Sequence, residues 1–200
     1  MLIIGNGESR SGINLDAYKC EKIGCNAIFR QYGVRHVVCC DRRMALEAVK
    51  SMINIKSGVW TRKDWHAEFI GKHNVNALPG IWYSPKTKAD EAFHWGSGPY
   101  AIYLGLFLNK KEPLDIIGFD LHSNNSTVNN IFKGTRNYED AESKPVDPKF
   151  WIYQIAQLIE KYKDRTFRFY NTPEWELPDS WKKPNVQKLD LSELDRMLNV

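Results

Sequence analysis

The sequence predicts an α/β fold in which a mainly parallel sheet carries helices on both faces. Short apolar runs that end in turn residues alternate along the chain with longer segments of helical periodicity. Parallel neighbours need crossover connections, and these crossovers place helices on the faces of the sheet. The length of 200 residues, 42% of them hydrophobic, is enough for one well-buried core.

The first part of the chain supplies most of the strands. Apolar runs that stop at a turn residue predict strands over 1–4, 22–26, 35–41, 59–60 and 75–78. Apolar residues at helical spacing predict helices over 42–53 and 61–70, the second begun by Thr61 with Asp64 at its third position.

The middle of the chain contains the clearest strand and the longest irregular segment. After the turn-rich residues 79–91, an apolar stretch started by Pro99 predicts a buried helix over 100–108. The next strand, 114–119, ends at Asp120. The polar segment 122–148 that follows has no convincing periodicity, and a connection of this length predicts a lid-like functional loop.

The last part of the chain closes the domain. A helix over 150–163 and a central strand over 166–170 are predicted, and prolines and tryptophans in 171–184 predict a segment that wraps the surface before a short helix over 190–198. We therefore expect residues 1–170 to form one α/β domain, with 171–200 as a C-terminal wrap of the same domain.

Composition excludes several classes of protein. The net charge of +4 is too small and too evenly scattered for a dedicated DNA or RNA binder. No signal peptide is expected, and no apolar run approaches the roughly 20 residues of a membrane span. The four cysteines lack C-x-x-C spacing, so reduced thiols in a cytoplasm are expected rather than a zinc or redox site.

The loops after the strands are the candidate site, because ligands of such sheets bind at the carboxyl ends of the strands. Gly5, Asn6, Gly7 and Ser9 follow the first strand, and their backbone could approach a phosphate with free N–H groups. The string is not G-x-G-x-x-G, since Arg10 stands where the third glycine belongs, so NAD is disfavoured. The alternative is a simple turn from strand to helix.

Two further strand ends carry polar side chains. The amide of Asn26 could bond a base or ribose edge, because it both donates and accepts. Asp41 could hold a hydroxyl or a metal, or it could simply cap the helix that follows.

A second glycine-rich turn, Gly96-Ser97-Gly98, opens a helix and could provide another cradle of N–H groups for an anion. His94 beside this turn, together with Asp120 and His122 at the end of the strand 114–119, is the only closely spaced acid–base group. For His94 the alternative is an ordinary loop histidine, and for Asp120 it is a cap of backbone donors.

Aromatic side chains make up 12% of the chain, more than one core needs. Trp95 and Tyr138 are the candidates to stack on a base or sugar, whereas Tyr100 and Phe119 are expected in the core.

Four of these strings carry a resemblance to a known family. They are residues 3–9 (IIGNGES), 24–26 (GCN), 96–98 (GSG) and 117–121 (IGFDL). In order and approximate spacing, over residues 1–125, they resemble the G-N-G-P-S, R-C-N, S-G and G-x-D strings of bacterial CMP-sialic-acid-dependent sialyltransferases. The resemblance implies a Rossmann-like fold, a lid that includes Asn137 and Tyr138 and closes over the donor, and a cytidine nucleotide surrounded by Asn6, Ser9, Asn26, Ser97 and Gly98.

The chain departs from that family's pattern at two places. Glu8 replaces the usual proline, and no histidine follows His122, whereas the family uses a catalytic histidine downstream in its lid. His122 falls where the family has a tyrosine that supports the leaving phosphate. The base would therefore be His122, His94 or Asp120, or be absent.

Similar strings occur in hydroxymethylpterin diphosphokinases. The whole chain also resembles small proteins of marine bacteriophages, which would place it in the host cytoplasm.

The leading hypothesis is a metal-independent transferase that uses a nucleotide-activated sugar of the CMP type and an acceptor of unspecified identity, with no tightly bound cofactor. The alternatives are a phosphotransferase that uses ATP and Mg²⁺ held by Asp41 and Asp120, or a non-catalytic binding protein. Whether the chain forms a homo-oligomer stays open.

Overall fold

A computed structural model describes residues 1–91, 94–122 and 127–198, so part of the predicted lid, residues 123–126, lies outside the described residues. The strands are β1 (Leu2–Ile4), β2 (Lys22–Cys25), β3 (His36–Cys39), β4 (Gly58–Thr61), β5 (Val75–Ala77), β6 (Leu114–Ile117), β7 (Phe167–Asn171) and β8 (Val186–Asp190). They form one sheet of order β5-β4-β3-β2-β1-β6-β7-β8, and every pairing is parallel. This confirms the predicted α/β, Rossmann-like fold.

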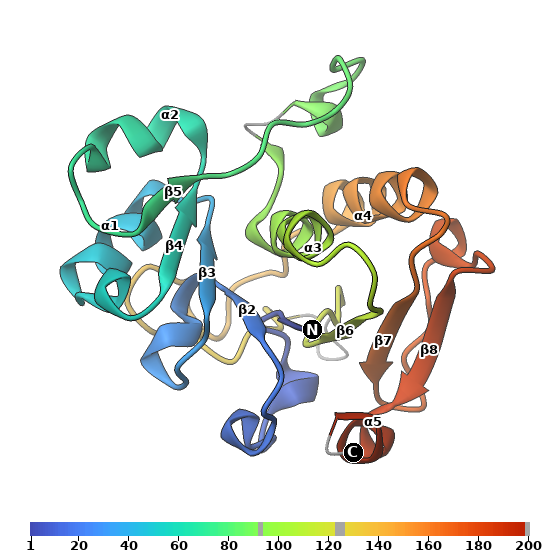
Figure 1. Cartoon of the computed structure of the whole chain (residues 1–200). Helices are drawn as coiled ribbons and strands as arrows, with labels where there is room; N and C mark the ends of the chain where they lie inside the picture. The colour runs from blue at the N-terminus through green and yellow to red at the C-terminus, as the bar shows by residue number, and fades with distance from the viewer. Residues whose placement is uncertain (92–93, 123–126, 199–200) are drawn as a thin grey trace.

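Both faces of the sheet are covered (Figure 1). Helices α3 (Ser97–Leu108) and α4 (Lys149–Lys161) pack on the face that includes Ile3 and Ile116. Helices α1 (Arg42–Lys50) and α5 (Leu194–Leu198) pack on the opposite face. Burial on both faces explains why the central strands read as continuous apolar runs rather than as alternating ones.

The crossovers from β1 to β2 and from β2 to β3 contain only short 3₁₀ turns, but they bury side chains such as Leu15, Ile28 and Val34 in the core of their face. The segment 127–148 adds to this cover, because Phe132 is buried in that core and Ile131 and Tyr138 pack against it. The predicted lid is thus partly a structural layer.

Several element boundaries differ from those predicted. Thr61 is the last residue of β4 instead of a helix cap, and helix α2 spans only Lys63–His66 before a 3₁₀ turn. Helix α3 begins at Ser97 with Gly96 as its N-cap residue, so Pro99 is its third residue and not its first.

The prediction that 171–184 only wraps the surface is wrong for Trp181. Its ring is fully buried and stacks on Phe169 with centroids 4.8 Å apart, and its indole Nε1 donates to the carbonyl of Ile152. The edge strand β8 was also missed. Its sequence shows no apolar run, because Gln187 and Lys188 are exposed at the sheet edge.

No helix in the described part of the chain has the length and apolar character needed to cross a membrane.

Candidate functional site

The strand order reverses between β1 and β6, which lie side by side at the centre of the sheet. Connections on the two sides of such a point go to opposite faces and leave a crevice at the carboxyl ends of the strands. A cavity of about 660 Å³ lies there, a volume typical of small-molecule sites. Most of the predicted site residues line it, namely Gly5, Asn6, Gly7, Asn26, Asp41, His94, Gly96, Ser97, Gly98 and Asp120.

Four predicted residues do not line this cavity. Ser9 is turned toward Asp120, and His122 is exposed outside the cavity wall. Asn137 and Tyr138 line a smaller neighbouring cavity instead.

The first glycine-rich loop bonds to the protein rather than offering free donors. The N–H groups of Gly5 and Gly7 donate to the carbonyls of Ile117 and Gly118, and those of Glu8 and Ser9 donate to the side chains of Asn129 and Asp120, all at 2.8–2.9 Å. The prediction of free N–H groups on this loop is therefore wrong for these four residues.

The glycines of this loop are explained by the neighbouring loop after β6. A Cβ atom on Gly5 would lie 2.2 Å from the carbonyl oxygen of Gly118. A Cβ atom on Gly7 would lie 2.4 Å from Cγ of Asp120. Contact between two loops of the protein, and not approach to a ligand, requires glycine at both positions.

Asp120 joins these loops, which agrees with its alternative interpretation as a cap of backbone donors. Its Oδ2 accepts from the N–H of Ser9 at 2.8 Å, and its Oδ1 accepts from the Ser9 hydroxyl and from Nδ2 of Asn171. The carboxylate is buried, so it acts first as a positioning group for the loop after β1.

The side chain of Asn6 is also committed to the protein. Its Nδ2 donates to the carbonyl of Cys25 and to the hydroxyl of Tyr138, while its Oδ1 accepts from Nη2 of Arg10. Arg10 is itself buried and donates to the carbonyl of Gly5 at 2.6 Å, and desolvation lowers its pKa to about 10. Asn6 therefore links the β1 loop to β2 and to the segment 127–148.

The second glycine-rich turn keeps donors available. The Ser97 hydroxyl donates to Oδ1 of Asn26 at 2.8 Å and accepts from the N–H of Cys40 at 2.9 Å, so α3 is tied to the ends of β2 and β3. Within the described residues, the backbone N–H groups of Ser97 and Gly98 and the Nδ2 of Asn26 have no partner. The positive end of the α3 dipole adds to this cluster.

The indole of Trp151 lies beside the same turn. A Cβ atom on Gly96 would be 2.7 Å from its Nε1, and Trp151 lines the cavity. This end of the cavity therefore presents hydrogen-bond donors, an arrangement that suits an anionic ligand.

The charged side chains that line the cavity after β3 and β4 are paired. Asp41 caps α1 by accepting from the N–H of Arg43 at 2.7 Å, as its alternative interpretation held. Arg42 pairs with Glu68, and Arg62 pairs with Asp64. Among the residues that the structure describes, no group of three or more His, Cys, Asp or Glu side chains is arranged to hold a metal ion.

The predicted acid–base group separates in the fold. His94 lines the cavity, with its Nε2 3.6 Å from Oε2 of Glu91 and its ring edge against Phe150. Because Asp120 is bonded to its neighbours and His122 lies outside, His94 is the histidine placed to meet a ligand.

The aromatic residues serve mainly as walls. Trp95 lines the cavity but is only 1% exposed and contacts Tyr100, so the prediction that its face is free for stacking is wrong. Tyr138 is held by its hydroxyl, and burial raises its pKa. Tyr100 and Phe119 are buried, as expected.

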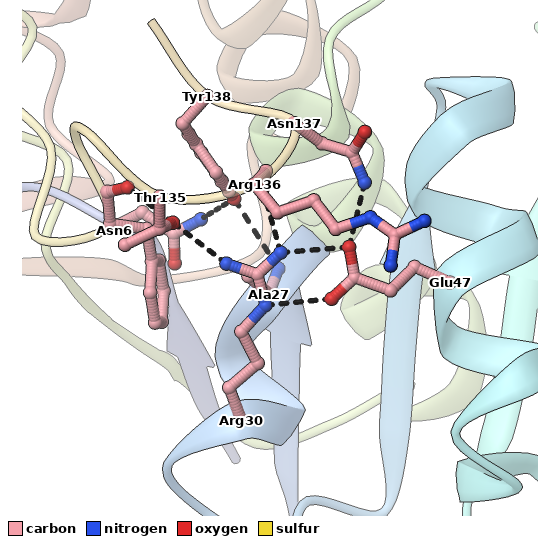
Figure 2. A network of polar contacts seen from close by, with 9 residues as sticks. Asn6, Ala27, Arg30, Glu47, Thr135, Arg136, Asn137 and Tyr138 are labelled. Carbon is pink, nitrogen blue, oxygen red and sulfur yellow. Dashed lines mark hydrogen bonds and ion pairs between the residues drawn. The ribbon is translucent and has the colours of Figure 1, made fainter. Parts of the chain in front are cut away.

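Sequence reasoning missed the network that fixes the segment 127–148, which Figure 2 shows. Arg30 makes two hydrogen bonds to Glu47, at 2.7 and 2.8 Å, and also donates to the hydroxyl of Thr135 and the carbonyl of Arg136. Asn137 donates to Glu47 at 2.7 Å. No local pattern could reveal it, because Arg30 and Thr135 are 105 residues apart.

The site thus combines N–H donors at the start of α3, a histidine and a wall of aromatic rings in one cavity at the switch point of the sheet. Comparisons of the chain with protein-family models, with curated proteins and with solved structures found no match.

Proposed function

We propose that the protein is a nucleotide-binding transferase that takes a nucleotide-activated sugar of the CMP type as donor. The observation that carries this proposal is the cluster of unpartnered donors at the start of α3, formed by Ser97, Gly98 and Asn26. A phosphate accepts hydrogen bonds from such a cluster, and the helix dipole favours its negative charge. A single donor cluster suits one phosphate, which favours CMP-type over diphosphate donors.

The proposed reaction starts with the donor phosphate bound at the start of α3. The oxygen of an acceptor hydroxyl forms a bond to the anomeric carbon of the sugar, and the bond from that carbon to the phosphate oxygen breaks. The phosphate leaves with the electron pair, stabilised by the donors of Ser97, Gly98 and Asn26. His94 takes the proton of the acceptor hydroxyl as general base.

Binding of the nucleotide is tested by thermal denaturation with CMP, CDP and UDP. CMP at 100 times its Kd should stabilise the fold by about 2.7 kcal/mol. Asn26→Asp keeps the oxygen that accepts from Ser97 but replaces the Nδ2 donor by a negative charge, so we expect CMP affinity to fall about 10- to 100-fold. Asn74→Asp is the matched control, since Asn74 is also an asparagine with positive φ, 55°, and does not line the cavity. Absence of a shift with all three nucleotides would refute the proposal.

Catalysis is tested by the release of CMP from CMP-sialic acid, followed by chromatography. His94→Gln should retain the thermal shift with CMP and lose most of the release, because the proton acceptor is gone while the phosphate contacts remain. His73→Gln, at an exposed position outside the cavity, should behave as the unmodified protein does. Equal rates for all three proteins would exclude His94 as the base.

The geometry favours the ATP and Mg²⁺ alternative less. Asp41 and Asp120 both line the cavity, yet each carboxylate already accepts a backbone N–H, from Arg43 and from Ser9 respectively. A thermal shift that appears with ATP only when Mg²⁺ is added would reverse this preference.

A further inference from the structure

A second, smaller cavity of about 180 Å³ adjoins the first. Both cavities are lined by the same four residues, Leu121, Asn129, Asn130 and Trp151, so they meet along a common wall. The rest of the second cavity comes from the segment 127–148, including Asn137 and Val146.

The second cavity offers donors and acceptors together. Asn130 uses its Oδ1 to accept from the N–H of Phe132, and Asn137 uses its Nδ2 to donate to Glu47. Within the described residues this leaves Nδ2 of Asn130 as a donor and Oδ1 of Asn137 as an acceptor without partners. The ammonium group of Lys133 is paired with Glu8 at 2.5 Å.

Such a wall fits a neutral, hydroxyl-rich ligand. Each sugar hydroxyl both donates and accepts a hydrogen bond, and amide side chains do the same. The indole of Trp151 gives an apolar surface for the C–H face of a ring. The cavity is much smaller than its neighbour, and its volume suits a single sugar ring.

We propose that the second cavity is the subsite for a neutral sugar acceptor. This inference rests on the proposed function. Trp151 connects the two sites, since it lies against Gly96 at the start of α3, where the phosphate is placed, and it directly follows Phe150, which touches His94. A sugar in the second cavity therefore presents a hydroxyl to the anomeric carbon beside His94.

The test uses a substitution that fills the second cavity and does not change the lining of the first. Val146 lines only the second cavity and is 57% exposed, so Val146→Trp adds bulk without disturbing the core. Val146→Ala is the matched control. The probes are CMP, in thermal denaturation, and methyl β-D-galactopyranoside and methyl β-D-glucopyranoside, in saturation-transfer NMR with CMP present.

We expect the unmodified protein and Val146→Ala to bind at least one methyl glycoside, and Val146→Trp to bind it at least 10-fold more weakly with an unchanged CMP shift. If Val146→Trp binds the glycoside as well as the unmodified protein, or if neither glycoside binds while CMP does, the acceptor subsite is refuted and the proposed function stands. If CMP gives no shift with the unmodified protein, the proposed function fails first.

Discussion

Single glycines at strand ends have two physical explanations that sequence alone does not separate. Gly5 and Gly7 follow a strand, as they would in a phosphate-binding loop, but both make room for the loop after β6. Gly96 and Gly98 likewise face the rings of Trp151 and Phe119. The distinguishing facts are contacts between distant segments, so residue types at the site could be predicted while their roles could not.

The packing role of Gly7 can be measured. In Gly7→Ala the new methyl group would overlap the carboxylate of Asp120, so we expect a loss of about 1–3 kcal/mol in the free energy of unfolding. Gly33→Ala is the control, because no atom lies within 4 Å of its Cβ position and its φ is not positive. Urea denaturation measures both variants. Equal stability of the two would mean that Gly7 is not constrained by packing.

The pair formed by Asn26 and Ser97 shows how far residue-level prediction reached. Asn26 was singled out at the end of a strand and Ser97 in the turn that opens a helix, and their side chains meet at 2.8 Å although they are 71 residues apart. Residues of both kinds gather at one edge of the sheet because the carboxyl ends of parallel strands converge there.

At the scale of elements, the sequence predicted what has strong apolar periodicity and missed what depends on tertiary contacts. The strands β1 to β7 and the helices α1, α3 and α4 fall where apolar patterns placed them. The segment 127–148 was recognised by its length and its polar, aperiodic sequence, but its anchors could not be, because Arg30 and Glu47 lie on other elements. The edge strand β8 has too few buried side chains to produce a pattern.

The Arg30–Glu47 pair should govern how firmly the segment 127–148 is held. In Glu47→Gln the carboxylate charge is lost, so we expect the local opening free energy to fall by about 1.5–3 kcal/mol. Hydrogen exchange of two backbone amides measures this opening free energy. The N–H of Ile131 donates to the carbonyl of Asn6 in the β1 loop, and the N–H of Tyr138 donates to the carbonyl of Thr135 within the segment. Glu68→Gln breaks a similar two-bond contact with Arg42, which is more exposed, and should change protection little.

The same pair predicts a pH dependence. The hydrogen bonds from Arg30, and then that from Asn137, hold the pKa of Glu47 below its ordinary value of 4.5. A carboxyl group of this kind stabilises the fold fully above its unfolded pKa and loses that contribution as the pH falls through its lowered folded pKa. Protection of the segment should decline below pH 4.5 in the unmodified protein more than in Glu47→Gln. Parallel pH profiles would show that the pair does not hold the segment.

At the scale of the whole molecule, the site exists only when both sides of the sheet are assembled. The cavity takes Asn26 from the turn after β2 on one side of the switch point and Phe119 and Asp120 from the loop after β6 on the other. The C-terminal part contributes to this assembly, because Nδ2 of Asn171 bonds to Asp120 and Trp181 packs in the same core as α3 and α4.

Removal of the Trp181 ring should therefore destabilise the entire fold rather than a surface segment. Trp181→Ala leaves a cavity beside Phe169 and removes the donor to the carbonyl of Ile152, and we expect it to cost about 3–5 kcal/mol, a large part of the stability of a domain of this size. Trp181→Phe keeps the stacked ring and should cost less. Urea denaturation followed by circular dichroism measures the whole sheet, and CMP binding reports the cavity. A single unfolding transition shifted to lower urea would show that residues 171–200 are part of the core that forms the site. If Trp181→Ala unfolds at the same urea concentration as the unmodified protein, these residues do not contribute to that core.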